Sequence, residues 1–211
     1  MTKVPVAGNV KTRLEPFLSA EQCAKLSTCF LLDAISKIES LRIPLITAYT
    51  PIQNRAILLK ILPAKQAIIE QTGETLGEKM FNAFQFAFAR NLDSVVMIGT
   101  DSPTLPGEFI ARAFEVLLKD EAVLGKTTDG GFYLIGLRIL HKQIFENVEW
   151  SSPKTFEQTA RNIEKLGLKL ALLPDWYDVD TPDDLKTLTE DLAKNPYVAP
   201  KTFDFVKNLF V

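Results

Sequence analysis

Apolar segments the length of β-strands alternate with helix-like segments along the chain, and this alternation constrains the fold more than any other feature. Strands are predicted at residues 43–49, 66–70, 94–98, 122–125, 131–137 and 168–173. Helices are predicted at residues 20–41, 51–62, 76–90, 106–119, 153–166 and 182–193. This order predicts an α/β fold with a mostly parallel central sheet and helices on both faces.

The length of 211 residues favours a single domain over residues 1–211. A short C-terminal helix at 201–210 is expected to dock on its body through Phe203, Val206 and Phe210. The net charge of −2 argues against nucleic acid as a partner. No apolar run is long enough for a membrane span, and no signal sequence is apparent, so a cytoplasmic protein is expected.

Cysteine and histidine are too few to support several common kinds of site. Cys23 and Cys29 lie six residues apart in a predicted helix and project from different faces, which favours buried thiols over a disulfide. No cysteine–histidine cluster suits structural zinc. A histidine-based triad would depend on His141 alone, the only histidine in the chain.

A basic loop near the start of the chain is a candidate phosphate site. Lys3, Lys11 and Arg13 supply cations within eleven residues, and Gly8 allows close approach of the backbone to a ligand. The spacing of a Walker A loop is missing. Taken alone, the segment is equally well interpreted as a solvated basic loop.

Two acidic loops follow later strands. In "GTDSPTLP", Asp101 follows the apolar run 94–98, where a carboxylate can either bind Mg²⁺ or Mn²⁺ or cap a following turn. In "DVDTPDDL", Thr181 is the predicted N-cap of a helix whose first turn accounts for the two aspartates at 183–184. Asp178 and Asp180 precede that helix, are not explained by its first turn, and are candidates for binding a metal.

The fourth loop is "TTDGGFY", in which Asp129 is followed by Gly130 and Gly131. Asp-Gly is a common hairpin turn, so a plain turn is one interpretation. Because ligands bind beyond the carboxyl ends of parallel strands, the four loops together predict a site for a nucleotide phosphate and a metal ion.

Six ordered segments resemble a known family: "KVPVAGNVKTRL", "TGETLGEKM", "GTDSPTLP", "TDGGFYLIGL", "EWSSPKTFEQT" and "DVDTPDDL". Together they resemble the glycosyltransferase-like family of unknown function within the nucleotide-diphospho-sugar transferase superfamily, some members of which are labelled arsenosugar-biosynthesis glycosyltransferases. The resemblance implies a GT-A fold, a three-layer sandwich that binds nucleotides.

The resemblance also implies roles for individual residues. Lys3, Gly8, Lys11 and Arg13 resemble the nucleotide-phosphate loop, and Asp101 and Asp180 resemble metal-binding aspartates, whose ion would be Mg²⁺ or Mn²⁺. Gly130 and Gly131 resemble a substrate loop, in which Asp129 orients or deprotonates an acceptor hydroxyl. Asp129 and Arg13 are therefore the expected catalytic residues.

Three functions stay open. The first is a metal-dependent glycosyltransferase that uses a nucleotide sugar and a small-molecule acceptor. The second is a nucleotidyltransferase that releases pyrophosphate, because the first loop also resembles that of phospholactate guanylyltransferases. The third is a module that binds a nucleotide without turnover. A homodimer is left open as well.

The chain departs from the family at its start, where relatives carry an apolar strand before the basic loop and only Met1 and Thr2 precede Lys3 here. Removing a central strand would leave unpaired backbone groups on its neighbours. We therefore expect the native gene product to carry about five to seven apolar residues before Met1, the usual length of a strand, or another segment to fill the slot. Direct pairing of the strand near Leu45 with the strand ending at Gly99 would instead indicate an altered sheet.

Overall fold

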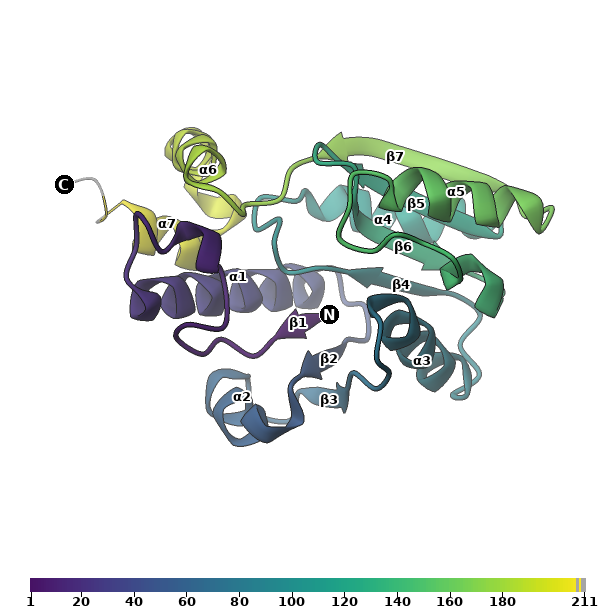
Figure 1. The fold of residues 1–211 in the computed structure, drawn as a ribbon, viewed down its shortest axis with the longest axis horizontal. Helices are drawn as coiled ribbons and strands as arrows, with labels where there is room; N and C mark the ends of the chain where they lie inside the picture. Colours follow the sequence, from purple (N-terminus) through teal and green to yellow (C-terminus); the bar gives the residue numbers. More distant parts are fainter. Residues whose placement is uncertain (208, 210–211) are drawn as a thin grey trace. The chain divides into compact units, whose positions relative to one another are not determined.

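The computed structural model describes residues 1–207 and 209, which form two compact units built from discontinuous segments (Figure 1). Unit 1 comprises Met1–Glu70, Thr100–Gly107 and Asp178–Val211. Unit 2 comprises Gln71–Gly99 and Glu108–Tyr177. The prediction of a single domain over residues 1–211 stays a prediction.

The sheet of unit 1 has three parallel strands in the order β1-β2-β3. These strands are β1 (Thr2–Lys3), β2 (Ile46–Thr50) and β3 (Ala67–Glu70). Thr2 of the short β1 pairs with Tyr49 of β2, and the amide of Val4 extends the ladder with a 2.8 Å hydrogen bond to the carbonyl of Thr50. β1 therefore ends next to β2, and the chain enters the basic loop from that point.

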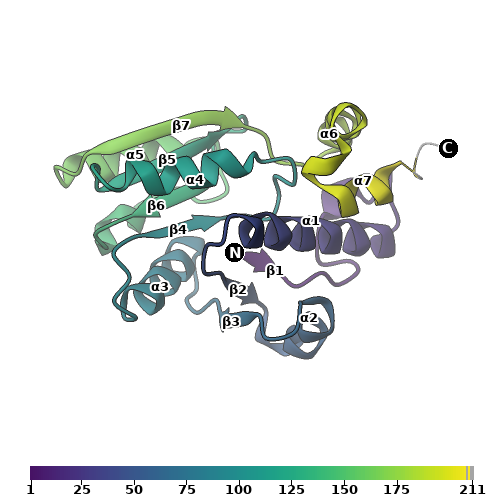
Figure 2. The same cartoon turned by 180° about the vertical axis from the view of Figure 1, so that it is seen from behind.

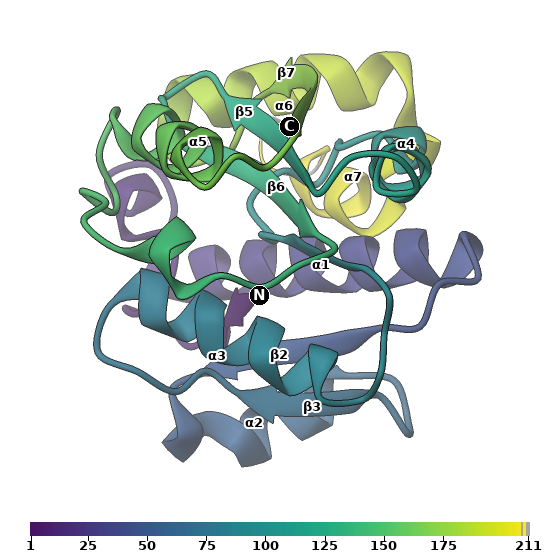
Figure 3. The ribbon, with the colours of Figure 1, turned by 90° about the vertical axis from the view of Figure 1, so that its right-hand side faces the viewer.

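The first helix of unit 1 was predicted from its cap. Ser19 accepts from the amide of Gln22, and the Gln22 side chain accepts from the amide of Ser19, so a capping box begins α1 (Ala20–Ser40). Figure 3 shows α1 next to the three-stranded sheet. The other helical segments of unit 1 are η1 (Thr12–Leu14), η2 (Ile52–Asn54), α2 (Arg55–Ile61), α6 (Pro182–Lys194), η4 (Pro196–Val198) and α7 (Pro200–Val206).

An apolar core joins these helices to the sheet. Leu31 and Ile35 of α1 pack with Tyr49 of β2, and Leu58 of α2 belongs to the same cluster. Val4, which directly follows β1, is fully buried there. The core therefore fixes the end of β1, from which the basic loop departs.

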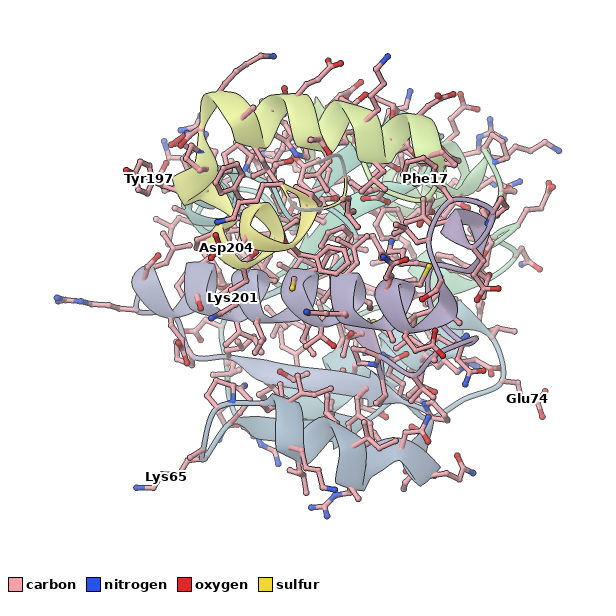
Figure 4. The ribbon with its side chains drawn as sticks, turned by 90° about the vertical axis from the view of Figure 1, so that its left-hand side faces the viewer. Phe17, Lys65, Glu74, Tyr197, Lys201 and Asp204 are labelled. Atoms are coloured by element: carbon pink, nitrogen blue, oxygen red, sulfur yellow. The ribbon has the colours of Figure 1, made fainter. Side chains whose placement is uncertain are left out.

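The C-terminal helix docks on α1 through a buried carboxylate. Asp33 of α1, which is 2% exposed, accepts hydrogen bonds from the amides of Lys201 and Thr202 at 3.1 and 2.8 Å and from the Thr202 hydroxyl at 2.7 Å. Figure 4 shows α7 beside α1 and labels Lys201, which belongs to α7. Val206 is buried and Phe203 partly buried, as expected for docking, whereas Phe210 lies outside the described residues.

Unit 2 contains a mixed sheet in the order β4-β6-β5-β7, whose strands are β4 (Val95–Ile98), β6 (Phe132–Leu137), β5 (Ala122–Thr127) and β7 (Leu170–Trp176). β6 is antiparallel to both of its neighbours, and β5 is parallel to β7. The helices are α3 (Leu76–Phe88), α4 (Gly107–Val116), η3 (Lys142–Phe145) and α5 (Thr155–Lys165). Figures 1 and 2 show α4 and α5 on opposite faces of this sheet.

The predicted α/β class is confirmed, and three of the five strand pairings in the described part of the chain are parallel. The ladders form two separate sheets, in which β2 pairs with β1 and β3 while β4 pairs with β6. The direct pairing that would indicate an altered sheet is therefore not seen between β2 and β4. The expected apolar stretch before Met1 stays a prediction.

Two further predictions concern cysteines and membranes. Cys23 and Cys29 are both free thiols; Cys23 is buried as predicted and Cys29 only partly so. In residues 1–207 and 209, none of the helices combines the length and the apolar character that crossing a membrane requires.

Candidate functional site

The basic loop turns back on itself directly after β1. Lys11 has a left-handed backbone conformation, with φ of 51° and ψ of 34°, and precedes the short helix η1. Leu14 at the end of η1 is fully buried and anchors the turn. This backbone geometry is uncommon at a residue other than glycine. The Lys11 side chain is only 5% exposed.

The Lys11 ammonium joins two carboxylates from distant parts of the chain. It forms ion pairs with Asp101 and with Asp180, the latter at 2.9 Å, and donates to the carbonyl oxygen of Val179 at 2.8 Å. It also lies 5.4 Å from the centre of the Phe30 ring. The carboxylates are more open, with side chains 48% exposed in Asp101 and 40% in Asp180. The ammonium is therefore the buried centre of the cluster.

Electrostatics keep Lys11 charged despite this burial. Desolvation acts to lower the pKa of the ammonium, but the charges of Asp101 and Asp180 and their hydrogen bonds outweigh it and raise the pKa above its ordinary value. In this structure a charged ammonium therefore lies between the two aspartates.

The loop that carries Asp101 is fastened through its backbone. The amide of Val179 donates to the Asp101 carbonyl at 2.9 Å, and the Ser102 hydroxyl donates to Asp178. These contacts join the loop to the segment before α6, which carries Asp180. The two predicted metal-binding segments therefore lie together, as expected from the sequence.

A lysine of α1 fastens the same loop from another direction. The Lys37 ammonium donates to the carbonyl oxygens of Pro103 and Leu105 at 2.7 and 2.6 Å. Burial lowers the pKa of Lys37 to about 8, an effect that the charge of Asp33 partly offsets. Sequence reasoning missed Lys37, because its acceptors are backbone carbonyls and leave no pattern in the side chains.

Asp180 is placed by the start of α6. Thr181 is the N-cap, as predicted, and forms a capping box with Asp184. Asp184 also accepts from the amide of Asp180 at 3.1 Å. Asp184 thus orders the backbone and leaves the Asp180 carboxylate to Lys11 and to Arg13, whose guanidinium lies 3.9 Å away.

The other residues predicted for the phosphate loop differ in their relation to the cluster. Arg13 is 74% exposed and lies 3.9 Å from Asp180, its one ion-pair partner within the described residues. Lys3 is exposed on β1, and Gly8 is exposed with φ of 75°. Of the four predicted residues, Lys11 and Arg13 are therefore brought together with Asp101 and Asp180.

The Asp129 loop belongs to unit 2 and forms the hairpin that joins β5 to β6. Asp129 accepts from the Thr127 hydroxyl at 2.5 Å and from the amide of Gly131 at 3.0 Å. Gly130 has φ of 91°, and a Cβ there would lie 2.2 Å from the carbonyl oxygen of Pro153. This geometry fits the hairpin interpretation of Asp-Gly-Gly, and the expected role of Asp129 toward an acceptor stays a prediction.

The carboxylates of Asp101 and Asp180 suit a divalent cation that takes its remaining ligands from a phosphate. Within residues 1–207 and 209, no group of three or more His, Cys, Asp or Glu is arranged to hold a metal. Two carboxylates are nevertheless what Mg²⁺ commonly takes from a protein, with phosphate oxygens and water completing its shell. Asp101 and Asp180 fit that pattern, although Lys11 already binds both.

Comparisons with known proteins identify relatives of this chain and of its fold. A protein from Desulfovibrio desulfuricans G20, described as a proposed nucleotide-diphospho-sugar transferase, is 30% identical with a TM-score of 0.93, over 98% of this chain and 91% of that chain. Two further structures show the same fold at low identity. They are 4-diphosphocytidyl-2C-methyl-D-erythritol synthase from Anaerococcus prevotii DSM 20548 (14% identity, TM-score 0.56, 79% and 86% covered) and a cytidylyltransferase from Leptospira borgpetersenii serovar Hardjo-bovis strain JB197 (13%, 0.55, 98% and 90%).

No curated protein matches the chain. A family model described as "Uncharacterized protein conserved in bacteria (DUF2064)" matches residues 34–152, which is more than half of the sequence. The resemblance inferred from the six motifs is thereby confirmed: the chain belongs to this DUF2064 family and has the fold of nucleotide-diphospho-sugar transferases.

Proposed function

We propose that the chain is a divalent-cation-dependent transferase that takes a sugar from a nucleotide sugar. The observation that carries the proposal is the cluster in which Lys11, from the loop after β1, meets Asp101 and Asp180 from two other loops. Cations and carboxylates together suit a reaction whose leaving group is a nucleoside diphosphate. The family relationship to a proposed nucleotide-diphospho-sugar transferase supports the same assignment.

In this reaction the bond between the anomeric carbon and the diphosphate breaks, and the acceptor oxygen bonds to that carbon. A divalent ion held by Asp101 and Asp180 would neutralise charge on the departing diphosphate. Lys11 supplies a point charge to phosphate oxygens, and Arg13 a planar fork of donors. The high exposure of Arg13 leaves its guanidinium free to turn toward a ligand.

The acceptor side of the proposal depends on Asp129. Its carboxylate is exposed and fixed by the Gly131 amide, so it has a defined orientation. We assign it the task of orienting or deprotonating the acceptor hydroxyl. The acceptor is a small molecule in this proposal.

Nucleotidyl transfer is the second candidate, because two structures of the same fold are a diphosphocytidyl-methylerythritol synthase and a cytidylyltransferase. In that reaction a phosphate oxygen of the acceptor attacks the α-phosphorus of a nucleoside triphosphate, and pyrophosphate leaves. The same cluster of Lys11, Asp101 and Asp180 would then serve the triphosphate. The two reactions differ in the released product, which makes them separable.

The test begins with a thermal-shift screen of nucleotides and nucleotide sugars, with and without Mn²⁺. A ligand at about 100 times its dissociation constant adds roughly 2.7 kcal/mol to the free energy of unfolding. The hits are then assayed with phosphorylated and hydroxylated acceptors. Release of nucleoside diphosphate supports glycosyl transfer, and release of pyrophosphate supports nucleotidyl transfer. Binding with no release of either product would indicate a binding module.

A further inference from the structure

The hydrogen-bonding capacity of Lys11 is completely used by the protein itself. A lysine ammonium has three N–H donors. Those of Lys11 meet three acceptors: carboxylate oxygens of Asp101 and Asp180, and the carbonyl of Val179. A phosphate oxygen can therefore be bound only if Lys11 releases at least one of these partners.

The same contacts stand in the way of a metal ion. Lys11 binds Oδ1 of Asp101 and Oδ1 of Asp180, which are natural ligand atoms for Mg²⁺ or Mn²⁺. The charges of Lys11 and Arg13 also balance those of the two carboxylates, so little net attraction for a divalent ion remains. An ion close to a buried ammonium would moreover be repelled strongly, because screening by water is weak there.

Phosphate and metal ion therefore face the same obstacle, the ion pairs between Lys11 and the two aspartates. Either of them pays the cost of detaching Lys11 from the aspartates when it binds first, and the other then binds without that cost. We propose that Lys11 is an internal cation that blocks the Asp101–Asp180 pair until the phosphate chain of a nucleotide draws the ammonium away, so that metal ion and nucleotide bind cooperatively. This inference rests on the proposed function for the identity of the ligand, and it adds the order in which the site is filled.

The burial pattern supports the exchange. The Lys11 side chain is 5% exposed, whereas the side chains of Asp101 and Asp180 are 48% and 40% exposed. An ion can therefore reach the two aspartates from solvent while Lys11 binds them from the buried side. The aspartates themselves need not move, because backbone contacts at Asp101 and a capping box after Asp180 hold them. Lys11 is thus the part of the cluster that changes partners.

The decisive experiment measures Mn²⁺ alone, without any nucleotide, by electron paramagnetic resonance of the free ion. Lys11→Met removes the competitor, and its affinity for Mn²⁺ is expected to rise about tenfold over the wild type. Lys186→Met is the matched control, because it deletes the same charge from an exposed position on α6 and should leave the affinity unchanged. The double variant Lys11→Met/Asp180→Asn should lose the gain.

A second variant, Lys11→Gln, guards against a folding defect of Lys11→Met, since glutamine keeps a hydrogen-bond donor without the charge; circular dichroism verifies both folds. Equal Mn²⁺ affinity of the wild type and either folded Lys11 variant overturns the proposal, because the ion then binds beside Lys11 or not at all. The measurement needs no turnover. A higher Mn²⁺ affinity of Lys11→Met, together with no reaction of any nucleotide sugar in the wild type, would therefore refute the proposed function and keep this inference.

Discussion

The amide of Val179 donates a hydrogen bond to the carbonyl oxygen of Asp101 over 2.9 Å, which ties two segments of unit 1 that are distant in sequence. Because the bond joins backbone to backbone, this contact between the Asp101 and Asp180 loops needs neither carboxylate. A change of side chain at this place can therefore remove chemistry without removing the loop, which makes the cluster accessible to mutagenesis.

Replacing Asp101 with alanine is expected to abolish metal-dependent nucleotide binding and to leave the fold intact. The loss of one ion pair to Lys11 should lower the free energy of unfolding by about 1–2 kcal/mol, which is small against the roughly 5–15 kcal/mol of an ordinary domain. Urea denaturation and calorimetric titration measure the two effects. An unfolded variant, or one that still binds nucleotide with metal like the wild type, would show that Asp101 has a structural role only.

Replacing Arg13 with alanine should weaken nucleotide binding about tenfold, because a charge-assisted bond to phosphate is worth roughly 1.5–3 kcal/mol. Stability should be nearly unchanged, since the side chain is 74% exposed and its nearest acidic partner is 3.9 Å away. Arg13→Lys serves as the control that keeps the charge and loses the planar fork. Unaltered affinity in Arg13→Ala would remove this residue from the proposed site.

The ammonium of Lys37 should make stability depend on pH in the alkaline range. Its pKa is about 8 in the folded chain and 10.5 ordinarily, so between these values the unfolded chain binds more protons than the folded one. The free energy of unfolding should consequently rise with pH from about 8 to 10.5, relative to a Lys37→Met variant that cannot titrate. Denaturation midpoints of both proteins from pH 7 to 11 test this. A difference that stays flat or falls with pH contradicts it.

Gly130→Ala should destabilise the chain more than Gly8→Ala, although both glycines have positive φ. A Cβ at Gly8 meets nothing within 4 Å, so only the conformational cost of about 1–2 kcal/mol applies. At Gly130 a Cβ would lie 2.2 Å from a backbone oxygen of Pro153, and overpacking should add about 1–3 kcal/mol. The comparison isolates the clash from the backbone strain, and equal losses of stability in the two variants would show that the hairpin moves to admit the methyl group.

Local signals predicted the elements of the fold well. The capping box at Ser19 and the N-cap at Thr181 fixed the starts of α1 and α6, because the residues that form a cap are neighbours in the sequence. The antiparallel placement of β6 was harder to predict. The Asp-Gly-Gly turn is compatible with a hairpin and with a ligand loop. The antiparallel pairing of β5 with β6 shows the hairpin and leaves the role toward a ligand a prediction.

The sequence indicated that some of the predicted site residues would lie together, but it did not indicate the contacts that they make. Sequence placed Lys11, Asp101 and Asp180 in one site because loops at the carboxyl ends of parallel strands converge. It could not predict that Lys11 would bind both aspartates, because that contact depends on a left-handed backbone at Lys11 and on its burial. Lys37 was not predicted for a similar reason. A lysine on a helix is usually solvated, and only the structure shows that the acceptors of Lys37 are backbone carbonyl oxygens.

The capping of α7 by Asp33 bears on how the chain is completed during synthesis. Unit 1 combines three separate segments of the sequence, and Asp33 receives its partners Lys201 and Thr202 only after residues 201 and 202 have left the ribosome. Until then the Asp33 carboxylate lacks the amide donors of Lys201 and Thr202. Until residue 180 has been made, Lys11 also lacks Asp180. By contrast, unit 2 is complete once synthesis has reached Tyr177, its last residue. We therefore expect a nascent chain released before α7 to be recognised by chaperones through unit 1.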